Sequence, residues 1–483
     1  MTKPQVHFIG IGGIGTSALA RWFLSHNYTV SGSDASSSEI TSQLKKQDIR
    51  VFIGHKAKNL PKGANLVIFS AAVPMDNPER RQAAKLGIPV KSYSEAVGDL
   101  VKQYKTLAVA GAHGKSTATA LLSLVLIKAG LDPTVIIGTK LKEFGNSNFK
   151  NGKGDYLVLE ADEYNGSFLN YSPFAAIILN IDVEHLDYYK NLKKIKNAFL
   201  KFIGNIQLNG ILILNKDDKN LSGLKNKIQK IARKKNIKII WYGIINSGRS
   251  SIICYKIRKI LKISGEPSNI HRDALLGEHN VSNALAVYTL AKALNIKKKD
   301  IFSAISRYRG AWRRMEYKGQ LKTHNSKLKA YIYDDYAHHP TEIKATLAGI
   351  AQKWPKTGLI CVFQPHQAKR LSLLFKAFIG AFDEANAVIL LPIYQVEGRD
   401  KVSQNVDSKK LVEAIKKRIN SKFKIQNSKL REVVYLPHSK NLPKVIKSIV
   451  KDQKSAVIIV MMGAGDIYKY TPLLLSSDGK RKS

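Results

Sequence analysis

The stretch TLAVAGAHGKSTATALLSLVLIKAG (106–130) decides the fold of the central part of the chain. Its apolar start, TLAVAG (106–111), predicts a buried strand, and its end, ATALLSLVLIKAG (118–130), predicts a strongly apolar helix. The segment between them, GAHGKST (111–117), is typical of a phosphate-binding loop, because glycines there expose backbone N–H groups to an anion. The stretch therefore predicts a nucleotide site at the end of a strand.

Two side chains in this loop have the chemistry that ATP requires. Lys115 can neutralise the β- and γ-phosphates, and the Ser116 hydroxyl can hold Mg²⁺. The spacing differs from the common phosphate-loop pattern, because only two residues separate Gly111 from Gly114. A plain turn with an incidental lysine is the alternative, and the flanking strand and helix disfavour it.

A second glycine turn lies near the N-terminus. QVHFIGIGGIG (5–15) leads from an apolar strand into a helix, and YTVSGSD (28–34) is a second strand that ends in Asp34. Gly10, Gly12 and Gly15 fit the fingerprint in which a helix N-terminus receives a pyrophosphate. Alone, this pattern suggests a NAD-dependent oxidoreductase. Such an enzyme has no use for a second, ATP-type loop, so an ATP-driven reaction is the better interpretation.

Two later strands end in groups that can bind metal. DYLVLEADEYNGSF (155–168) and AAIILNIDVEHLDYY (175–189) both pass from apolar residues into acidic ones. The residues at these two ends are Glu160, Asp162, Glu163, Asp182, Glu184, His185 and Asp187. Strand carboxyl ends are where open α/β sheets bind ligands, which predicts that both ends lie beside the phosphate loop. Glu160 suits Mg²⁺, whereas His185 is a less usual Mg²⁺ ligand and has a loop hydrogen bond as its alternative role.

The remaining sequence offers candidates of lower specificity. In LLGEHNVSNALAVYTLAKAL (275–294), His279 or Asn280 could bind a purine edge, although Asn280 is also a good helix N-cap. Arginines 309, 313 and 314 mark a linker to a third alternating segment, which ends in a glycine turn at 463–466. Its candidates, each at a strand end, are Asp335, His338, His366 and Arg370. A single histidine at such a place is as often structural as functional.

The length of 483 residues exceeds what one hydrophobic core supports. We expect an α/β protein of three domains. They are an N-terminal Rossmann-like domain (1–103), a central P-loop ATPase domain with a mainly parallel sheet (104–311) and a C-terminal Rossmann-like domain (312–483). Monomer and homodimer both stay open.

The net charge of +42 is the unusual feature of the composition. A nucleic-acid binder would explain it, but the lysines alternate with apolar residues, as in KNLKKIKNAFLK (190–201), and lack regularly spaced aromatics. We favour solvated lysine faces over nucleic-acid binding. Cys254 and Cys361 sit among apolar neighbours, which indicates buried thiols in a reducing compartment. No secretory signal or membrane-spanning run is evident, so a cytoplasmic protein that does not bind membranes is expected.

Nine ordered segments resemble the Mur ligase family, and within it the branch that adds L-alanine. They are HFIGIGGIG, AGAHGKST, EADEYNGSF, NIDVEHLDYY, LLGEHNVSNALA, RRMEYKG, DDYAHHPTEI, FQPH and GAGDI, and they extend from residue 5 to residue 470. The resemblance implies an ATP- and Mg²⁺-dependent ligase of peptidoglycan precursor synthesis. Its small-molecule substrates would be UDP-N-acetylmuramate, L-alanine and ATP.

The resemblance also implies roles for particular residues. The UDP-sugar would be held by Gly12, Gly13, Ile14, Gly15, Asp34 and Ser70. ATP would be held by Gly111, Ala112, His113, Gly114, Lys115, Ser116 and Thr117, with His279 and Asn280 at adenine and Arg314 and Asp335 reaching the nucleotide. The metal would be held by Ser116, Glu160 and His185. The incoming amino acid would be bordered by Tyr336, His338, His366 and Arg370. The residues implied in catalysis are Lys115, Glu160, His185, Arg314 and Asp335.

Three departures from the family pattern bear on these roles. The loop reads GAHGKS where threonines are usual, although Ser116 keeps the hydroxyl. Tyr164 and Asn165 stand where Ser-Asp is usual, which removes one carboxylate near the metal. Gln367 stands where an arginine is typical, so a guanidinium is missing from the amino-acid pocket. The alternatives are a sister ligase that recycles a ready-made peptide and a basic, nucleotide-dependent nucleic-acid-binding protein.

Overall fold

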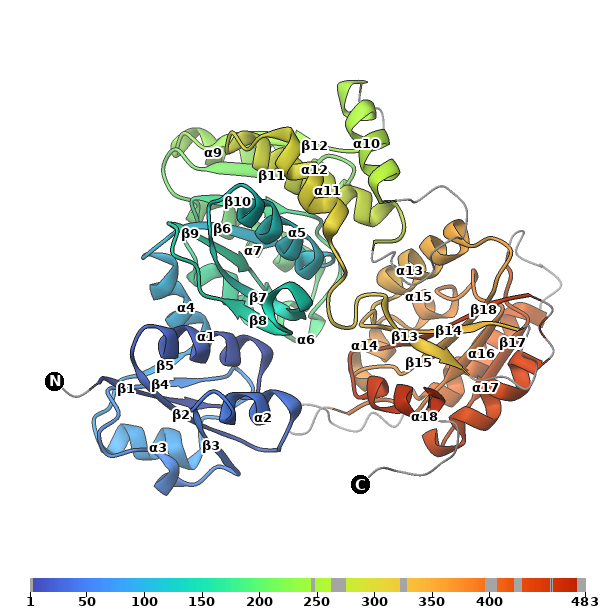
Figure 1. Cartoon of the computed structure of the whole chain (residues 1–483), viewed down its shortest axis with the longest axis horizontal. Helices are drawn as coiled ribbons and strands as arrows, with labels where there is room; N and C mark the ends of the chain where they lie inside the picture. The colour runs from blue at the N-terminus through green and yellow to red at the C-terminus, as the bar shows by residue number, and fades with distance from the viewer. Residues whose placement is uncertain are drawn as a thin grey trace. The chain divides into compact units, whose positions relative to one another are not determined.

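The computed structural model describes residues 3–244, 248–261, 275–321, 328–395, 406–420, 428–451, 453 and 455–475. Its chain forms two compact units (Figure 1). The first unit comprises Met1–Cys254 and Ser282–Tyr308, and the second comprises Tyr255–Val281 and Arg309–Ser483. The first unit contains two sheets and the second contains one.

The first sheet is parallel and has the order β3-β2-β1-β4-β5. Its elements are β1 (Gln5–Ile9), α1 (Ile14–Ser25), β2 (Thr29–Asp34), α2 (Glu39–Lys45), β3 (Arg50–Ile53), β4 (Leu66–Phe69), α3 (Pro78–Lys85), β5 (Val90–Ser92) and α4 (Tyr93–Val101). Helices α1 and α4 pack with Val6 and Phe8 on one face, while Ala83 of α3 packs with Ile9 and Val67 on the other. This is the Rossmann-like arrangement expected from alternating strands and helices.

The second sheet has the order β12-β11-β10-β6-β9-β7-β8. Its strands are β6 (Lys105–Ala110), β7 (Thr134–Leu141), β8 (Ser147–Lys150), β9 (Tyr156–Glu160), β10 (Ala175–Ile178), β11 (Ile211–Asn215) and β12 (Lys238–Tyr242). The sheet is mainly parallel, as predicted, but β8 pairs antiparallel with β7 at one edge. Strands β9 and β10 flank β6 directly, so the segments that follow these three strands meet at one edge.

Helices α5 to α12 belong to the same stretch of the chain as the second sheet, and several of them carry lysines. They are α5 (Lys115–Lys128), α6 (Leu186–Tyr189), α7 (Leu192–Asn205), α8 (Lys219–Ser222), α9 (Lys225–Lys234), α10 (Gly248–Ile260), α11 (Glu278–Ala293) and α12 (Lys298–Arg307). Ile195 and Phe199 of α7 are buried, whereas Lys193 and Lys194 are exposed. The lysines of this helix therefore face solvent, as the amphipathic pattern predicts.

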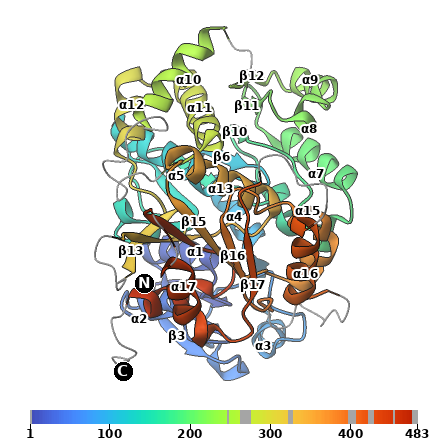
Figure 2. The ribbon, with the colours of Figure 1, turned by 90° about the vertical axis from the view of Figure 1, so that its right-hand side faces the viewer.

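The third sheet forms the core of the second unit, with the order β13-β14-β18-β15-β16-β17. Its strands are β13 (Glu316–Leu321), β14 (Ala330–Asp335), β15 (Gly358–Phe363), β16 (Ala387–Leu390), β17 (Glu432–Tyr435) and β18 (Val457–Met462), and β13 pairs antiparallel with β14. Its helices include α13 (Pro340–Lys353), α14 (Ala368–Leu373), α15 (Phe375–Ile379), α16 (Ser408–Asn420), α17 (Leu442–Lys451) and α18 (Thr471–Leu475). Figure 2 shows β15, β16 and β17 side by side, with α15 and α16 on one side and α17 on the other.

Alternate residues of these strands serve the two faces of the third sheet. Cys361 and Phe363 pack with α15 and α16 residues, and Ile360 and Val362 pack with α17 residues. Because side chains of a strand alternate between faces, a strand buried on both sides must be apolar throughout. Cys254 and Cys361 are both buried thiols, as predicted.

No helix in the part of the chain that the structure describes is long and apolar enough to span a lipid bilayer.

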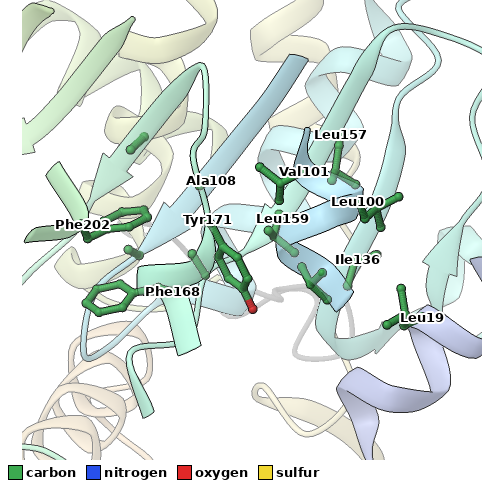
Figure 3. Close-up of a cluster of buried hydrophobic side chains, with 14 of the residues drawn as sticks. Leu19, Leu100, Val101, Ala108, Ile136, Leu157, Leu159, Phe168, Tyr171 and Phe202 are labelled. Carbon is green, nitrogen blue, oxygen red and sulfur yellow. The ribbon is translucent and has the colours of Figure 1, made fainter. Parts of the chain in front are cut away.

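Within the first unit, helix α1 packs on the first sheet and also on the β7–β8 hairpin of the second sheet. Figure 3 shows Leu19 of α1 at the border of a buried cluster that includes Ile136 of β7. Asn148 of β8 is 2% exposed and donates to Ser17 Oγ at 3.0 Å and to the Ile14 carbonyl. Its Oδ1 accepts a hydrogen bond from the buried Arg21 at 2.7 Å. Helix α1, which begins at the N-terminal glycine turn, is thus anchored by the buried side-chain amide of Asn148.

We expect Asn148→Ala to lower the free energy of unfolding by about 1–3 kcal/mol, because the Arg21 guanidinium and the Ile14 carbonyl each lose a buried partner. Asn151→Ala, at an exposed residue of the following loop, is the matched control and should change stability by less than about 0.5 kcal/mol. Urea denaturation followed by circular dichroism measures both variants. Equal midpoints for the two would exclude an anchoring role of Asn148.

Candidate active site

The phosphate loop lies between β6 and α5, as the sequence predicts, and its backbone is fixed from neighbouring segments. The Asn180 side chain accepts from the His113 N–H at 2.8 Å and donates to the His113 carbonyl at 3.0 Å. Gly114 has φ of 84°, and a Cβ there would lie 2.6 Å from Oδ1 of Asn283. A side chain at position 114 is therefore excluded by conformation and by space. The His113 ring itself pairs with Asp182 at 2.9 Å.

Lys115 is directed back onto the loop and onto the end of β9. Its Nζ donates to the Gly111 carbonyl at 2.8 Å and to Glu163 Oε2 at 2.7 Å, and lies 3.6 Å from Asp162. Burial lowers the pKa of Lys115, but the negative charges of Glu163 and Asp162 outweigh burial and raise that pKa above its ordinary value. Lys115 is therefore a fixed positive charge at the N-terminus of α5, where phosphates are favoured.

Ser116 and Glu160 meet at the same edge. Ser116 Oγ donates to Glu160 Oε1 at 2.9 Å, and the backbone N–H of Gly138 donates to Glu160 Oε2 at 2.8 Å. Ser116 and Thr117 are both buried. The hydroxyl and carboxylate expected to serve the metal are thus brought together, one from α5 and the other from β9.

His185 lies beside Glu163 rather than beside Glu160. Its Nε2 is 3.4 Å from Glu163 Oε1, and the Tyr164 ring packs on its imidazole with centroids 4.9 Å apart. His185 has a left-handed backbone with φ of 54° and precedes α6. Burial lowers the pKa of His185, but the Glu163 charge outweighs it and raises the pKa above the usual value. Of the three expected metal ligands, Ser116 and Glu160 are in contact, and His185 contacts a different carboxylate.

The donor atoms at this edge fit a divalent cation. Ligand atoms of Asp162, Glu163 and His185 lie within 4.8 Å of one another. Glu163 Oε1 is buried and makes no hydrogen bond to any residue that the structure describes. Carboxylate oxygens and a hydroxyl are ligands that Mg²⁺ prefers, so the carboxylates of Asp162 and Glu163 and the Ser116–Glu160 pair suit that ion.

The N-terminal glycine turn lies at the N-terminus of α1, where an anion is favoured, and one of its N–H groups is hydrogen-bonded within the protein. Gly13 is the N-cap of α1, and the Gly12 N–H donates to Asp34 Oδ2 at 2.8 Å. A Cβ at Gly12 would lie 2.9 Å from that oxygen, so the close approach requires glycine. Ser70 follows β4, next to β1, and its N–H donates to the Ile9 carbonyl at 2.9 Å. Gly12, Asp34 and Ser70 therefore gather where the strand order reverses between β1 and β4.

Residues expected at adenine lie at the start of α11, in a stretch assigned to the second unit. Asn280 Nδ2 donates to the Leu276 carbonyl at 2.8 Å and lies 3.1 Å from His279 Nε2. The Asn280 side chain is therefore engaged in closing the turn that begins the helix.

In the second unit, Asp335 ends β14 and organises the turn around it. It is buried and accepts from the N–H groups of Met315 at 2.8 Å and Ala337 at 2.9 Å. Burial raises the pKa of Asp335, opposed by the charge of Arg314 and these hydrogen bonds. The Arg314 guanidinium lies over the Tyr336 ring at 5.1 Å. The structure thus brings together Arg314, Asp335 and Tyr336.

His338, His366 and Arg370 also gather near the ends of β14 and β15. Arg370 Nη1 lies 3.1 Å from His366 Nδ1, and the His366 ring stacks on Tyr394 at 5.5 Å. Because a guanidinium only donates, Nδ1 accepts, and neutral His366 carries its proton on Nε2. The His338 and His366 ring centroids are 6.2 Å apart. Gln367, next in the chain, has φ of 66° and donates its N–H to the Tyr394 carbonyl at 3.1 Å.

Sequence reasoning missed several residues that build these sites. Arg313, taken only as part of a linker, is 3% exposed, donates to the Gly463 carbonyl and lies over the rings of Tyr336 and Tyr468. Asn180 fixes the phosphate loop by hydrogen bonds from a distant segment, and the Asn283 side chain lies against Gly114; both belong to the family-like segments, but neither was given a role. Glu163 was noted as one of three acids but was given no role.

Comparisons with known proteins identify the family of this chain. Models of the Mur ligase family match nearly the whole chain: the catalytic domain over residues 5–105, the middle domain over 109–291 and the glutamate ligase domain over 313–465. A UDP-N-acetylmuramate–L-alanine ligase of Clostridium botulinum (strain Kyoto / Type A2) is 40% identical over 97% of this chain and 96% of its own. One from Clostridium kluyveri is 37% identical over 98% of both chains.

Solved structures show the same fold. The UDP-N-acetylmuramate-alanine ligase of Thermotoga maritima superposes with a TM-score of 0.72, at 26% identity over 98% of both chains. A murein peptide ligase of Psychrobacter arcticus superposes with a TM-score of 0.64 at 22% identity, again over 98% of both chains. With three family segments in order and relatives at 40% identity along its length, the chain belongs to the Mur ligase family.

Proposed function

We propose that this chain is an ATP-dependent ligase that joins L-alanine to the lactyl carboxylate of UDP-N-acetylmuramate, in peptidoglycan precursor synthesis. The observation that carries the proposal is the position of Lys115 on the phosphate loop, beside the Ser116–Glu160 pair. Together these groups can bind a phosphoryl group of ATP. The full-length likeness to relatives named for this activity supports the substrates. We further propose a cytoplasmic enzyme, monomeric or homodimeric.

The division of labour follows from the positions of the motifs. We propose that residues 1–103 bind the UDP-sugar, 104–311 bind ATP and 312–483 bind the amino acid. Three separate sheets and three family segments with similar limits support this division. The proposed UDP-sugar residues are Gly12, Gly13, Ile14, Gly15, Asp34 and Ser70. The proposed amino-acid residues are Tyr336, His338, His366 and Arg370.

The reaction needs an activated acyl group, because a carboxylate is a poor electrophile. Transfer of the γ-phosphoryl group from ATP to the lactyl carboxylate gives an acyl phosphate, and attack by the amine releases inorganic phosphate. Lys115 would stabilise the negative charge on the transferring phosphoryl group, which is the main electrostatic demand of that step. Holding the reactants in line can supply an effective molarity on the order of 10⁵ M.

Mg²⁺ would neutralise phosphate charge when bound. Ser116 and Glu160 would hold it. His185 would be a further ligand and would bind through Nδ1, because its Nε2 faces Glu163. Arg314 and Asp335 are proposed to reach the nucleotide, and His279 and Asn280 to contact adenine.

Phosphate release from ATP with Mg²⁺ and UDP-N-acetylmuramate tests the function directly, with L-alanine, glycine, L-serine and a tripeptide offered in parallel. We expect release that requires the UDP-sugar and is greatest with L-alanine. Greatest release with the tripeptide would instead identify a peptide-recycling ligase. Release with none of these amines would refute ligase activity, and retention on mixed nucleic acid would then become the property to measure.

We expect Lys115→Ala to abolish turnover and to leave UDP-N-acetylmuramate binding intact, since its contacts lie within the phosphate loop and the end of β9. Coupled phosphate release measures the first property and isothermal titration calorimetry the second. Substantial residual ligase activity would show that this loop is not the ATP site.

We expect Gln367→Arg to lower the KM for L-alanine about tenfold and to change the KM for ATP less, because a guanidinium can bind a carboxylate through two hydrogen bonds. Gln367→Lys is the matched control: it adds the charge without the planar fork and should have a smaller effect. Steady-state kinetics with each substrate varied in turn measures both. Equal changes in the two KM values would remove position 367 from the amino-acid pocket.

A further inference from the structure

Glu163 occupies a central place among the groups of the phosphate loop, although no motif assigns it a role. Its side chain is 2% exposed, and its two oxygens face different partners: Oε2 accepts from Lys115 at 2.7 Å, and Oε1 lies 3.4 Å from His185 Nε2. One buried carboxylate therefore lies between the lysine of the loop and the histidine that follows β10.

The backbone of Glu163 is tied to the same segment as its side chain. Its carbonyl accepts from the Tyr189 hydroxyl at 2.5 Å, and Tyr189 is the last residue of α6, the helical turn that begins after His185. His185 has a left-handed backbone, which a residue with a Cβ adopts only when its surroundings hold it. The position of His185 thus depends on Glu163 through the side chain and through the main chain.

The charges at this site explain how the contacts of Glu163 with Lys115 and His185 would affect nucleotide binding. A buried ammonium without a partner is unfavourable, and Glu163 supplies that partner while Lys115 rests on the Gly111 carbonyl. Burial raises the pKa of Glu163, but the charges of Lys115 and His185 lower it to about 2, so the carboxylate stays ionised at neutral pH. A triphosphate brought to the loop competes with this carboxylate for the same ammonium.

We infer that Glu163 is a positioning residue for phosphoryl transfer. It retains Lys115 against the loop before nucleotide binds and fixes the relative positions of Lys115 and His185 during the reaction. This inference rests on the proposed function, and it assigns Glu163 an opposite effect on binding and on turnover. Without the Glu163 charge, the Lys115 ammonium interacts with the phosphates alone, so ATP binds more tightly. Without the alignment of Lys115 and His185, phosphoryl transfer is slower.

A purely structural carboxylate would behave differently, and Glu79 provides the comparison. Glu79 of α3 is 0% exposed, accepts from Ser33 Oγ at 2.7 Å and pairs with the buried His7 at 2.8 Å, so it too is a buried carboxylate facing a histidine. Neutralising it should lower the melting temperature without a specific effect on ATP. Glu79→Gln is therefore the matched control for Glu163→Gln.

The experiment measures the Kd for ATP by calorimetry, kcat by phosphate release, and the melting temperature for the parent, Glu163→Gln, Glu163→Asp and Glu79→Gln. We expect Glu163→Gln to bind ATP about 3- to 10-fold more tightly and to lose about 30-fold or more in kcat. Glu163→Asp keeps the charge but is too short to reach both Lys115 and His185. Its Kd should stay within about twofold of the parent while its kcat falls about tenfold.

The inference is overturned if Glu163→Gln binds ATP no more tightly than the parent, or if its kcat stays within about twofold of the parent value. Weaker binding and slower turnover in proportion to a lower melting temperature, as a structural defect produces, would also overturn it. A parent protein without ligase turnover would refute the proposed function instead. In that case the Kd comparison still decides whether Glu163 competes with nucleotide for Lys115.

Discussion

Parallel pairing of β6 with β9 on one side and β10 on the other is the constraint on which the candidate site depends. All three strands end at the same edge, so the phosphate loop, Glu160 and the segment leading to His185 meet although long stretches of chain separate them. The interior residues of each strand are buried on both faces and are mostly apolar, and β9 ends in Glu160 itself. Polar side chains then accumulate at the first positions beyond the strands, where the helix N-terminus of α5 adds its own positive field.

Charge balance is the second organising feature of this edge. The Lys115 side chain is only 13% exposed, and a largely buried cation is stable only when paired. Glu163 and Asp162 provide the compensation, and Glu160 is held separately by Ser116 and the Gly138 N–H. Glu163 therefore lies beside Lys115, and Glu160 lies beside the Ser116 hydroxyl. This arrangement suits a nucleotide that brings both phosphates and a metal ion.

The second unit also contains buried charged groups, an aspartate and an arginine, that are stabilised by their neighbours. Asp335 is buried at the end of β14 and is satisfied by backbone N–H groups, while Arg313 extends from the preceding segment to the glycine turn after β18. Aromatic rings of Tyr336 and Tyr468 enclose the Arg313 guanidinium. These contacts hold together the segment before β13, the turn after β18 and Tyr336, so part of the proposed amino-acid site is positioned by a buried guanidinium.

The sequence by itself determined the α/β class, the glycine turns, the phosphate loop and the family, because each rests on local spacing: apolar strand, glycine turn, amphipathic or apolar helix. It also marked Lys115, Ser116, Glu160 and His185 as candidates. It did not reveal the antiparallel pairing of β8 and β13, since strand direction is set by partners distant in the chain. Only the tertiary structure decided that His185 faces Glu163 rather than Glu160, and that Asn180, Asn283 and Arg313 support the sites. Such contacts join residues from separate strands and helices, and their side-chain chemistry alone does not distinguish them from ordinary polar residues at a surface.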